Sequence, residues 1–160
     1  MAKLSAGILF HRRRGDGIEV LLVHPGGPFW ARRDEGAWSI PKGEFVESEE
    51  DAEHAARREF TEETGWRYDG PLQPLGRVRQ ASGKTVVAFA AEADFDAATL
   101  ASNSFAMEWP PGSGRMQSIP EVDRADWFSL AVAEDKILAG QRPLLHAVAK
   151  MPGVTPPQPR

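Results

Sequence analysis

The sequence contains no cysteine, and histidine is scarce, with four in 160 residues. The missing cysteines exclude disulfide bonds, thiol catalysis, iron–sulfur ligation and thiolate zinc sites. The histidines lie too far apart along the chain for a zinc-binding pattern; they are His11, His24, His54 and His146. Any bound metal is therefore expected to be a hard cation with oxygen ligands.

The sequence also lacks a long apolar segment. The N-terminal apolar run from Leu4 to Phe10 is shorter than a membrane span, and no cleavage-site pattern precedes Arg12-Arg13-Arg14. This run favours a β-strand over an export signal or a membrane anchor. We therefore expect a cytoplasmic protein that does not associate with a membrane.

An excess of positive charge is missing as well, since the formal net charge is −4. This balance disfavours non-specific nucleic-acid binding, and no specific nucleic-acid partner is expected. The acidic residues are concentrated between Glu44 and Glu63. This segment contains nine acidic side chains and two arginines, a net charge of −7. The other 140 residues therefore carry a net charge of +3.

The length and the 41% content of hydrophobic residues are those of one globular domain. A chain of this size buries roughly 70% of its unfolded surface, so it needs no disulfide or metal to hold its core. We expect a single domain over residues 1–150 and a proline-rich tail over residues 151–160. Pro152–Arg160 contains four prolines and is expected to be extended or disordered.

Periodicity and chain breakers predict a mixture of strands and helices. Strands are expected at Leu4–His11 and Ile18–His24 around a Gly15-Asp16-Gly17 turn, at Trp38–Ile40 before a break at Pro41-Lys42-Gly43, at Leu75–Gln80, at Lys84–Asp94 and at Trp127–Phe128. Helices are expected at Asp51–Thr64 ending at Gly65, at Leu130–Leu138 capped by Ser129, and from Pro143 to Lys150. The segment from Asn103 to Pro120 is expected to be irregular.

The expected helix at Asp51–Thr64 carries small apolar residues and carboxylates on one stripe. These residues are Ala52, Ala55, Ala56, Glu59, Glu62 and Glu63. The pairs Glu53 with Arg57 and Arg58 with Glu62 would also suit a simple solvated helix. However, partly removing three like charges from water costs more free energy than such pairs contribute, unless a cation binds the carboxylates. Carboxylates at this spacing suit Mg²⁺, or Mn²⁺ in its place, and thereby a phosphate ester or anhydride substrate.

The same segment resembles the Nudix box, the signature of the Nudix hydrolase (MutT-like) superfamily. The matching residues are Gly43, Glu50, Arg58-Glu59-Phe60, Glu62-Glu63, Gly65 and Trp66. The order and the spacing agree from Glu50 onward, but six residues separate Gly43 from Glu50, one more than the pattern has. We assign this extra residue to the loop before the helix. The resemblance covers most of residues 3–150 and implies an α/β fold, a Nudix-type α/β/α sandwich with a mixed β-sheet between helices.

The resemblance implies a role for each matching residue. By this resemblance, the metal is coordinated by Glu59, Glu62 and Glu63 and by the backbone carbonyl of Gly43. Glu50 and Arg58 form a structural salt bridge. The implied reaction is Mg²⁺-dependent cleavage of a phosphoanhydride in a nucleoside diphosphate linked to another group, a pyrophosphohydrolase activity. Non-catalytic Nudix-like nucleotide-binding modules form an alternative, but they commonly lack part of the glutamate set that is complete here.

The substrate-binding residues are predicted from position and chemistry. Lys42 lies beside the metal-facing Gly43, and Arg32 and Arg33 are candidates to meet phosphate. Phe29, Trp30 and Trp109 lie in Gly/Pro-rich segments where a base could stack, although core packing is the alternative. We expect a small nucleotide or polyphosphate partner. A dinucleoside polyphosphate or nucleoside triphosphate ranks first, with a nucleotide sugar, ADP-ribose or an inositol pyrophosphate as alternatives.

Many members of the superfamily also use a further glutamate from a later loop. The candidates are Glu92, Glu108 and Glu121. We favour Glu121 as a catalytic residue because it precedes the expected Trp127–Phe128 strand, as the family's late glutamate commonly does. Glu108 is the runner-up, and Glu59 becomes the leading base if neither serves.

Overall fold

The computed structural model describes residues 4–15 and 17–151. Asp16, in the predicted first turn, and the predicted tail Pro152–Arg160 lie outside the described residues. Six strands form the main sheet: β1 (Leu4–Arg14), β2 (Gly17–Pro25), β3 (Lys42–Phe45), β4 (Gln73–Arg79), β5 (Thr85–Glu92) and β8 (Val122–Ser129). The sheet order is β4-β5-β1-β2-β8, and β3 pairs with one end of β1. The sheet is mixed, because β1 and β5 run parallel while the other pairs run antiparallel.

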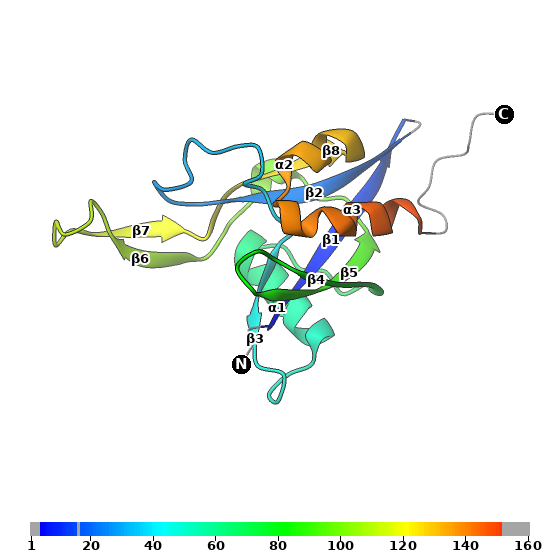
Figure 1. The fold of residues 1–160 in the computed structure, drawn as a ribbon, viewed down its shortest axis with the longest axis horizontal. Helices are drawn as coiled ribbons and strands as arrows, with labels where there is room; N and C mark the ends of the chain where they lie inside the picture. Colours follow the sequence, from blue (N-terminus) through cyan, green and yellow to red (C-terminus); the bar gives the residue numbers. More distant parts are fainter. Residues whose placement is uncertain (1–3, 16, 152–160) are drawn as a thin grey trace.

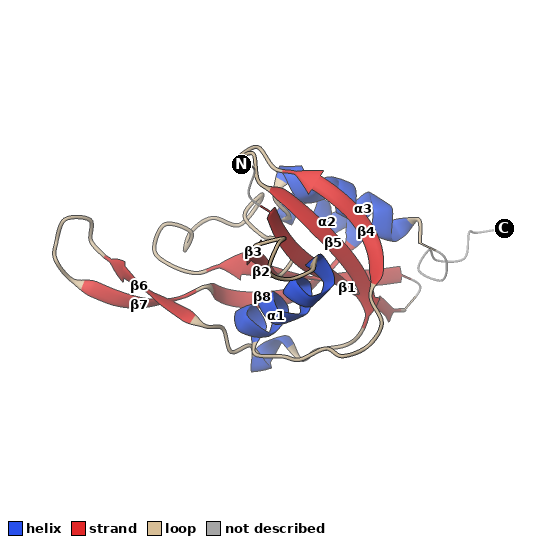
Figure 2. Cartoon of the chain, turned by 90° about the horizontal axis from the view of Figure 1, so that it is seen from below, coloured by secondary structure: helices blue, strands red, loops and turns tan. Residues whose placement is uncertain are grey.

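Helices cover both faces of this sheet (Figures 1 and 2). One face carries α1 (Ala52–Thr64), and the other carries α2 (Leu130–Lys136) and α3 (Arg142–Ala149). Two short 3₁₀ turns lie at Ala97–Thr99 and Ala139–Gln141. The predicted α/β/α sandwich with a mixed sheet is confirmed.

Two apolar clusters separate the three layers because neighbouring residues of β1 point to opposite faces. Ile8 and Phe10 belong to the cluster beneath α1, which contributes Phe60. Leu9 belongs to the other cluster, which includes Leu144 of α3. The central strand is therefore buried on both sides, which explains its nearly continuous apolar sequence.

The predicted helix at Asp51–Thr64 is present as α1, with caps at both ends. The Asp51 side chain accepts a hydrogen bond from the His54 backbone N–H at 2.8 Å. Gly65 adopts a left-handed conformation with φ of 78°, and its N–H donates to the Thr61 carbonyl at 2.8 Å. Both boundaries agree with the prediction because both signals are local in sequence.

The expected strand at Trp38–Ile40 and the expected break at Pro41-Lys42-Gly43 are wrong. Ser39 and Trp38 make only isolated bridges, to Val23 and Ile137 respectively. The strand β3 instead begins at Lys42, opposite Gly7 of β1. A Cβ atom at Gly7 would lie 2.5 Å from the Pro41 carbonyl oxygen, so the glycine allows this segment to approach β1.

The segment from Asn103 to Pro120 was expected to be irregular, but it contains a β-hairpin. Strands β6 (Ser104–Glu108) and β7 (Met116–Pro120) pair antiparallel as a two-stranded ribbon, which we call the ribbon. It extends away from the main sheet in both views (Figures 1 and 2). The chain breakers Pro110-Pro111-Gly112 lie in the turn that joins the two strands, where they interrupt neither.

The C-terminal elements follow the prediction with changed bounds. The Ser129 hydroxyl caps α2 by accepting from the Val132 N–H at 3.3 Å. The helix stops at Lys136 rather than Leu138, since the Leu138 N–H donates to the Trp38 carbonyl at 2.8 Å. The strand predicted at Trp127–Phe128 is longer and spans all of β8.

Across residues 4–15 and 17–151, no helix has the length and apolar character needed to cross a membrane.

Candidate active site

Glu59 of α1 lies directly against Gly43 of β3. The Glu59 residue is 8% exposed, and a Cβ atom built on Gly43 would lie 1.9 Å from its carboxylate oxygen Oε2. Only glycine can therefore occupy position 43 without moving this carboxylate. Burial raises the pKa of Glu59 from its ordinary value, against the opposing effect of Arg58.

Arg58 binds three carboxylates around the start and the middle of α1. Its Nη2 lies 2.5 Å from Glu50 Oε1 and its Nε lies 3.2 Å from Glu50 Oε2. Its Nη1 lies 2.7 Å from Glu59 and 3.3 Å from Glu62. Hydrogen bonds from Arg58 and, to a smaller extent, from His54 lower the pKa of the Glu50 carboxyl to about 2. This guanidinium therefore ties the loop before α1 to the helix.

The extra residue between Gly43 and Glu50 is accommodated by a turn. The backbone N–H groups of Glu49 and Glu50 both donate to the Val46 carbonyl, at 2.9 and 3.1 Å. This turn lies between β3 and α1, at the place where the sequence assigned the insertion. Gly43 still contacts Glu59, and Glu50 still pairs with Arg58, so the insertion leaves both ends of the loop attached.

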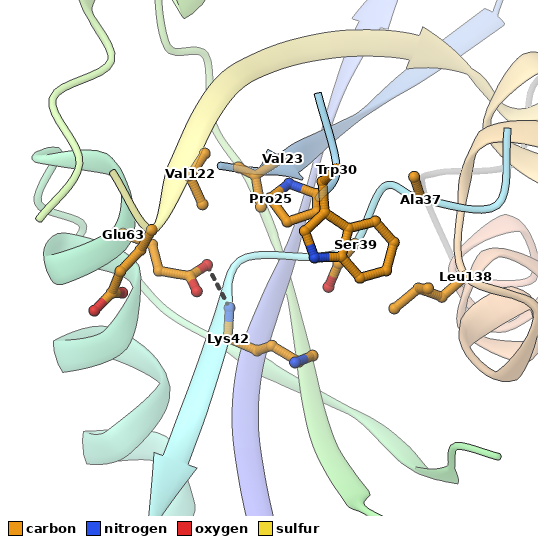
Figure 3. Close-up of a pocket in the computed structure, with 10 residues that line it drawn as sticks. Val23, Pro25, Trp30, Ala37, Ser39, Lys42, Glu63, Val122 and Leu138 are labelled. Carbon is orange, nitrogen blue, oxygen red and sulfur yellow. Dashed lines mark hydrogen bonds between the residues drawn. The ribbon is translucent and has the colours of Figure 1, made fainter. Parts of the chain in front are cut away.

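Glu63 and Lys42 meet across the gap between α1 and β3. The Lys42 backbone N–H donates to Glu63 Oε1 at 3.1 Å, as the dashed line in Figure 3 shows. Burial raises the pKa of Glu63 to about 8. Burial also lowers the pKa of the Lys42 ammonium. The Lys42 side chain points away from Glu63, toward the side of Trp30 and Leu138 (Figure 3).

Glu121 is brought to the same place by backbone contacts with the last turn of α1. The Asn103 N–H donates to the Glu62 carbonyl at 2.9 Å, and the Asn103 carbonyl accepts from the Glu121 N–H at 2.8 Å. Burial, together with the charge of Glu62, raises the pKa of the Glu121 carboxyl. Asn103 thereby links the chain at Glu121 to the helix that carries the other glutamates.

A cavity of about 200 Å³ opens beside these groups (Figure 3). Its polar lining includes Lys42, Glu63 and Glu121, and its apolar lining includes Val23, Trp30 and Leu138. Glu108 does not line it: the Glu108 carboxylate accepts from the Gly112 N–H at 2.6 Å, in the turn of the ribbon. Among the three late acids that the sequence offered, Glu121 is the one at the cavity.

Trp30 reaches the cavity from the loop between β2 and β3, which we call the aromatic loop (residues 26–37). Its ring meets the Phe29 ring edge-on with centroids 5.3 Å apart. The Arg33 guanidinium lies 4.5 Å from the Phe29 ring centroid and 5.6 Å from that of Trp30. Arg32 and Arg33 are exposed and do not line the cavity, so the structure separates them from Lys42.

His24 holds the aromatic loop, a role that no pattern in the sequence indicates. The imidazole is fully buried, with Nε2 2.6 Å from the Arg33 carbonyl oxygen and Nδ1 2.8 Å from Asp123 Oδ1. A carbonyl oxygen can only accept, so Nε2 carries a hydrogen. The ring thus joins the loop of Trp30 to β8, and its partner Asp123 lies 99 residues away in the sequence.

The residues around α1 fit a hard divalent cation. Within residues 4–15 and 17–151, no three acidic or histidine side chains form a metal-binding cluster. Arg58 forms ion pairs with Glu59 and Glu62. The donors are nevertheless all oxygen atoms, as Mg²⁺ prefers. Burial disfavours the charged forms of Glu59, Glu63 and Glu121 and so raises their pKa values, whereas a bound cation would favour the charged carboxylates.

A family model described as the NUDIX domain matches residues 1–148. No curated protein shows a significant match to the chain.

Solved structures give matches that cover nearly all of the chain. The Ap4A hydrolase of C. elegans in a binary complex is 23% identical with a TM-score of 0.61, covering 91% of this chain and 94% of that one. The NUDIX domain of Shewanella oneidensis NrtR, complexed with ADP ribose, is 19% identical with a TM-score of 0.60, covering 92% and 86%. A mutT/nudix family protein from Listeria innocua is 19% identical with a TM-score of 0.58, covering 91% and 90%. At these identities the likeness concerns the fold.

Proposed function

This chain belongs to the Nudix hydrolase family, and from that premise we propose that it cleaves a phosphoanhydride in a nucleoside diphosphate linked to a second group. One observation carries the proposal: Glu63 from α1 and Glu121, the residue before β8, line one cavity together with Lys42. A cavity with carboxylates on one side and an ammonium on its wall suits metal-assisted hydrolysis of a phosphate anhydride.

The proposed cofactor is Mg²⁺, with Mn²⁺ as a substitute. The Nudix family generally uses divalent metal ions. Here the ion would be held by the carboxylates of Glu59, Glu62 and Glu63 and by the carbonyl of Gly43. When bound, it supplies positive charge that stabilises the developing negative charge on the phosphoryl group and acidifies water. Glu50 and Arg58 would hold the loop to the helix without touching substrate.

Glu121 is proposed as the general base. The water oxygen forms a bond to phosphorus, the bond from phosphorus to the bridging oxygen breaks, and the water proton passes to the Glu121 carboxylate. A carboxyl whose pKa is raised by burial is a better proton acceptor near neutral pH than an exposed one. Glu121 lines the cavity together with Glu63, whereas the other two candidate bases, Glu92 and Glu108, do not line it.

Substrate binding is proposed to involve Lys42 for phosphate and Trp30 for a base. The Lys42 side chain extends along the cavity on the side of Trp30 (Figure 3), so an anionic group there would meet both. Arg32 and Arg33, on the exposed part of the aromatic loop, would attract the outer phosphates of the substrate.

We place a dinucleoside polyphosphate or a nucleoside triphosphate first as substrate. The likeness to an Ap4A hydrolase supports this class. A nucleotide sugar, ADP-ribose or an inositol pyrophosphate is the alternative, and the NUDIX domain solved with ADP ribose supports the second of these. A second candidate function is a nucleotide-binding module without hydrolysis, and the observation behind it is that a NUDIX domain of this fold binds ADP ribose. We rank it lower because the glutamate set is complete.

The testing experiment is a hydrolysis screen with Mg²⁺ over dinucleotides, nucleoside triphosphates, sugar nucleotides and inositol pyrophosphates, in which the phosphorylated products are separated by chromatography. The Glu63→Gln variant should lose the activity, whereas Glu53→Gln, which alters an exposed acid on the same helix, should retain it. Metal-dependent nucleotide binding without any hydrolysis product would favour the binding module instead.

A further inference from the structure

The ribbon presents one apolar face. Residues directly opposite each other in an antiparallel pair project to the same face, and alternate residues along a strand share it. Phe105 lies opposite Ile119, and Met107 lies opposite Gln117. The Trp109 N–H donates to the Arg115 carbonyl at 2.9 Å, which continues the same ladder. Phe105, Met107 and Trp109 therefore share one face, which we call the apolar face of the ribbon.

The apolar face turns toward the aromatic loop. A Cβ atom built on Gly27 of that loop would lie 3.1 Å from Ile119 Cγ2, and Ile119 projects from the apolar face. The Gly26 N–H also donates to the Glu121 carbonyl at 3.0 Å. The loop and the base of the ribbon extend on the same side of the molecule in both views (Figures 1 and 2). The aromatic loop and the base of the ribbon thus lie side by side, next to the cavity that Trp30 and Glu121 line.

Aromatic rings on both elements stay in contact with solvent. Phe29 on the aromatic loop is 57% exposed, and Phe105 on the ribbon is 44% exposed. Exposed aromatic rings next to a polar site are typical of a binding surface rather than of a core. The ribbon carries only one acid and one base, Glu108 and Arg115, so it does not repel a polyphosphate.

The cavity is too small for a whole dinucleotide. Pockets that enclose a drug-sized ligand have volumes of about 300–1,000 Å³, whereas this one has about 200 Å³. It can take phosphate groups and part of one nucleoside, and the remainder must lie outside. The surface beside Glu121 is the ribbon, because β7 ends at Pro120, the residue before Glu121.

The distance along the ribbon selects Phe105. Ile119, which faces Phe105, precedes Glu121 by two residues, and at about 3.4 Å per strand residue this is about 7 Å. Arg115, which faces Trp109, precedes Glu121 by six residues, or about 20 Å on the same scale. A nucleoside joined to phosphates in the cavity therefore meets Phe105 first.

We propose that the apolar face of the ribbon, with Phe105 nearest the cavity, binds the second nucleoside of a dinucleoside polyphosphate by stacking on its base. The first nucleoside then lies at Trp30 and the phosphates lie between the two. This inference rests on the proposed function, and it selects dinucleotides over mononucleotides within it. A base of either nucleoside has a flat face, so stacking gives binding with little preference for the kind of base.

The test compares two variants on two substrates. Phe105→Ala removes the ring of the apolar face, and Met116→Ala is the matched control, since Met116 faces Glu108 on the opposite face and is 64% exposed. For diadenosine tetraphosphate, Phe105→Ala should raise KM by about five- to a hundredfold. For adenosine tetraphosphate, which has no second nucleoside, KM should stay within about twofold. Met116→Ala should change neither KM, and Phe105→Trp should restore the wild-type value.

Binding measured in parallel separates failure of this inference from failure of the proposed function. Dissociation constants of the same two nucleotides are determined by calorimetry with Phe105→Ala and Met116→Ala in the Glu63→Gln background. The selective loss for diadenosine tetraphosphate should appear there even if the wild-type protein hydrolyses neither nucleotide. An equal loss for both nucleotides, no loss, or no binding of either would overturn the inference. So would a dimer, seen by sedimentation, that Phe105→Ala dissociates while the dinucleotide affinity stays unchanged.

Discussion

Replacing Arg58 by alanine should cost stability before it costs catalysis. The guanidinium holds Glu50 at 2.5 Å and also contacts Glu59 and Glu62. Its removal releases the loop before α1 and leaves the buried Glu59 carboxylate without its cation. Fully exposed ion pairs contribute about 0.2–1 kcal/mol, and hydrogen bonds to charged groups contribute about 1.5–3 kcal/mol. Arg58 is 34% exposed at its side chain and Glu50 is 18% exposed, so we expect a loss of about 1–2 kcal/mol.

In a domain of this length, such a loss lowers the melting temperature by about 2–8 °C. The loss should depend on pH in a defined direction. Because Arg58, together with His54, lowers the pKa of Glu50 from 4.5 to about 2, the ion pair of Glu50 with Arg58 stabilises the fold above pH 4.5 and loses its effect as the pH falls toward 2. The difference between wild type and Arg58→Ala should therefore be largest near pH 7 and shrink below pH 5.

The assay is thermal unfolding in metal-free buffer from pH 3 to pH 8. Arg67→Ala is the control, since Arg67 pairs with Asp69 on the surface with side chains 80% and 72% exposed. Its melting temperature should change little at any pH. A variant Arg58→Ala that melts with the wild type but is inactive would refute this reasoning and would place Arg58 on the substrate.

The remaining predictions concern single side chains around the cavity. Glu63→Gln should reduce kcat by about a hundredfold. Without metal, this variant should be more stable than wild type, and the difference in stability should grow between pH 4.5 and 8. The reason is that burial raises the pKa of Glu63 to about 8, so its charged form opposes folding. Trp30→Ala should raise KM by about five- to a hundredfold with a smaller effect on kcat; unchanged kinetics would exclude the aromatic loop from the site. Glu121→Gln should lower kcat and remove the acid limb of the pH–rate profile, and activity lost in Glu108→Gln instead would transfer the base to Glu108. His24→Phe should lower the melting temperature and raise KM, and its effect on KM should vanish when Trp30 is also alanine.

Sequence signals that are local in the chain predicted their elements well. The Asp51 cap and the Gly65 terminus define α1 within one turn of the helix, so no distant contact was needed to place either end. The carboxylate stripe followed from the same helix, and Glu59 is indeed buried against Gly43. The mixed sheet between helices followed from the Nudix box rather than from any strand by itself.

Signals that depend on distant partners were missed. Pro41-Lys42-Gly43 was predicted to break a strand, but Gly7 on β1 makes room for that segment to pair. Pro110-Pro111-Gly112 lies in the ribbon's turn, so it marks a hairpin where an irregular loop was expected. The buried bond between His24 and Asp123 joins residues that no local pattern relates.

The loop between Gly43 and Glu50 shows why a spacing pattern is a poor substitute for the contacts behind it. Enlarging a flexible loop from five to six residues raises its closure cost by only about 0.2 kcal/mol. Selection therefore has little energetic reason to preserve the residue count, whereas Gly43 against Glu59 and Glu50 on Arg58 fix where the loop must start and finish. A search that allows variable loop length but requires both attachments would find chains of this kind, and one with rigid spacing would pass over them. The same tolerance makes the turn at Val46–Glu50 a suitable place to insert a peptide tag or a reporter.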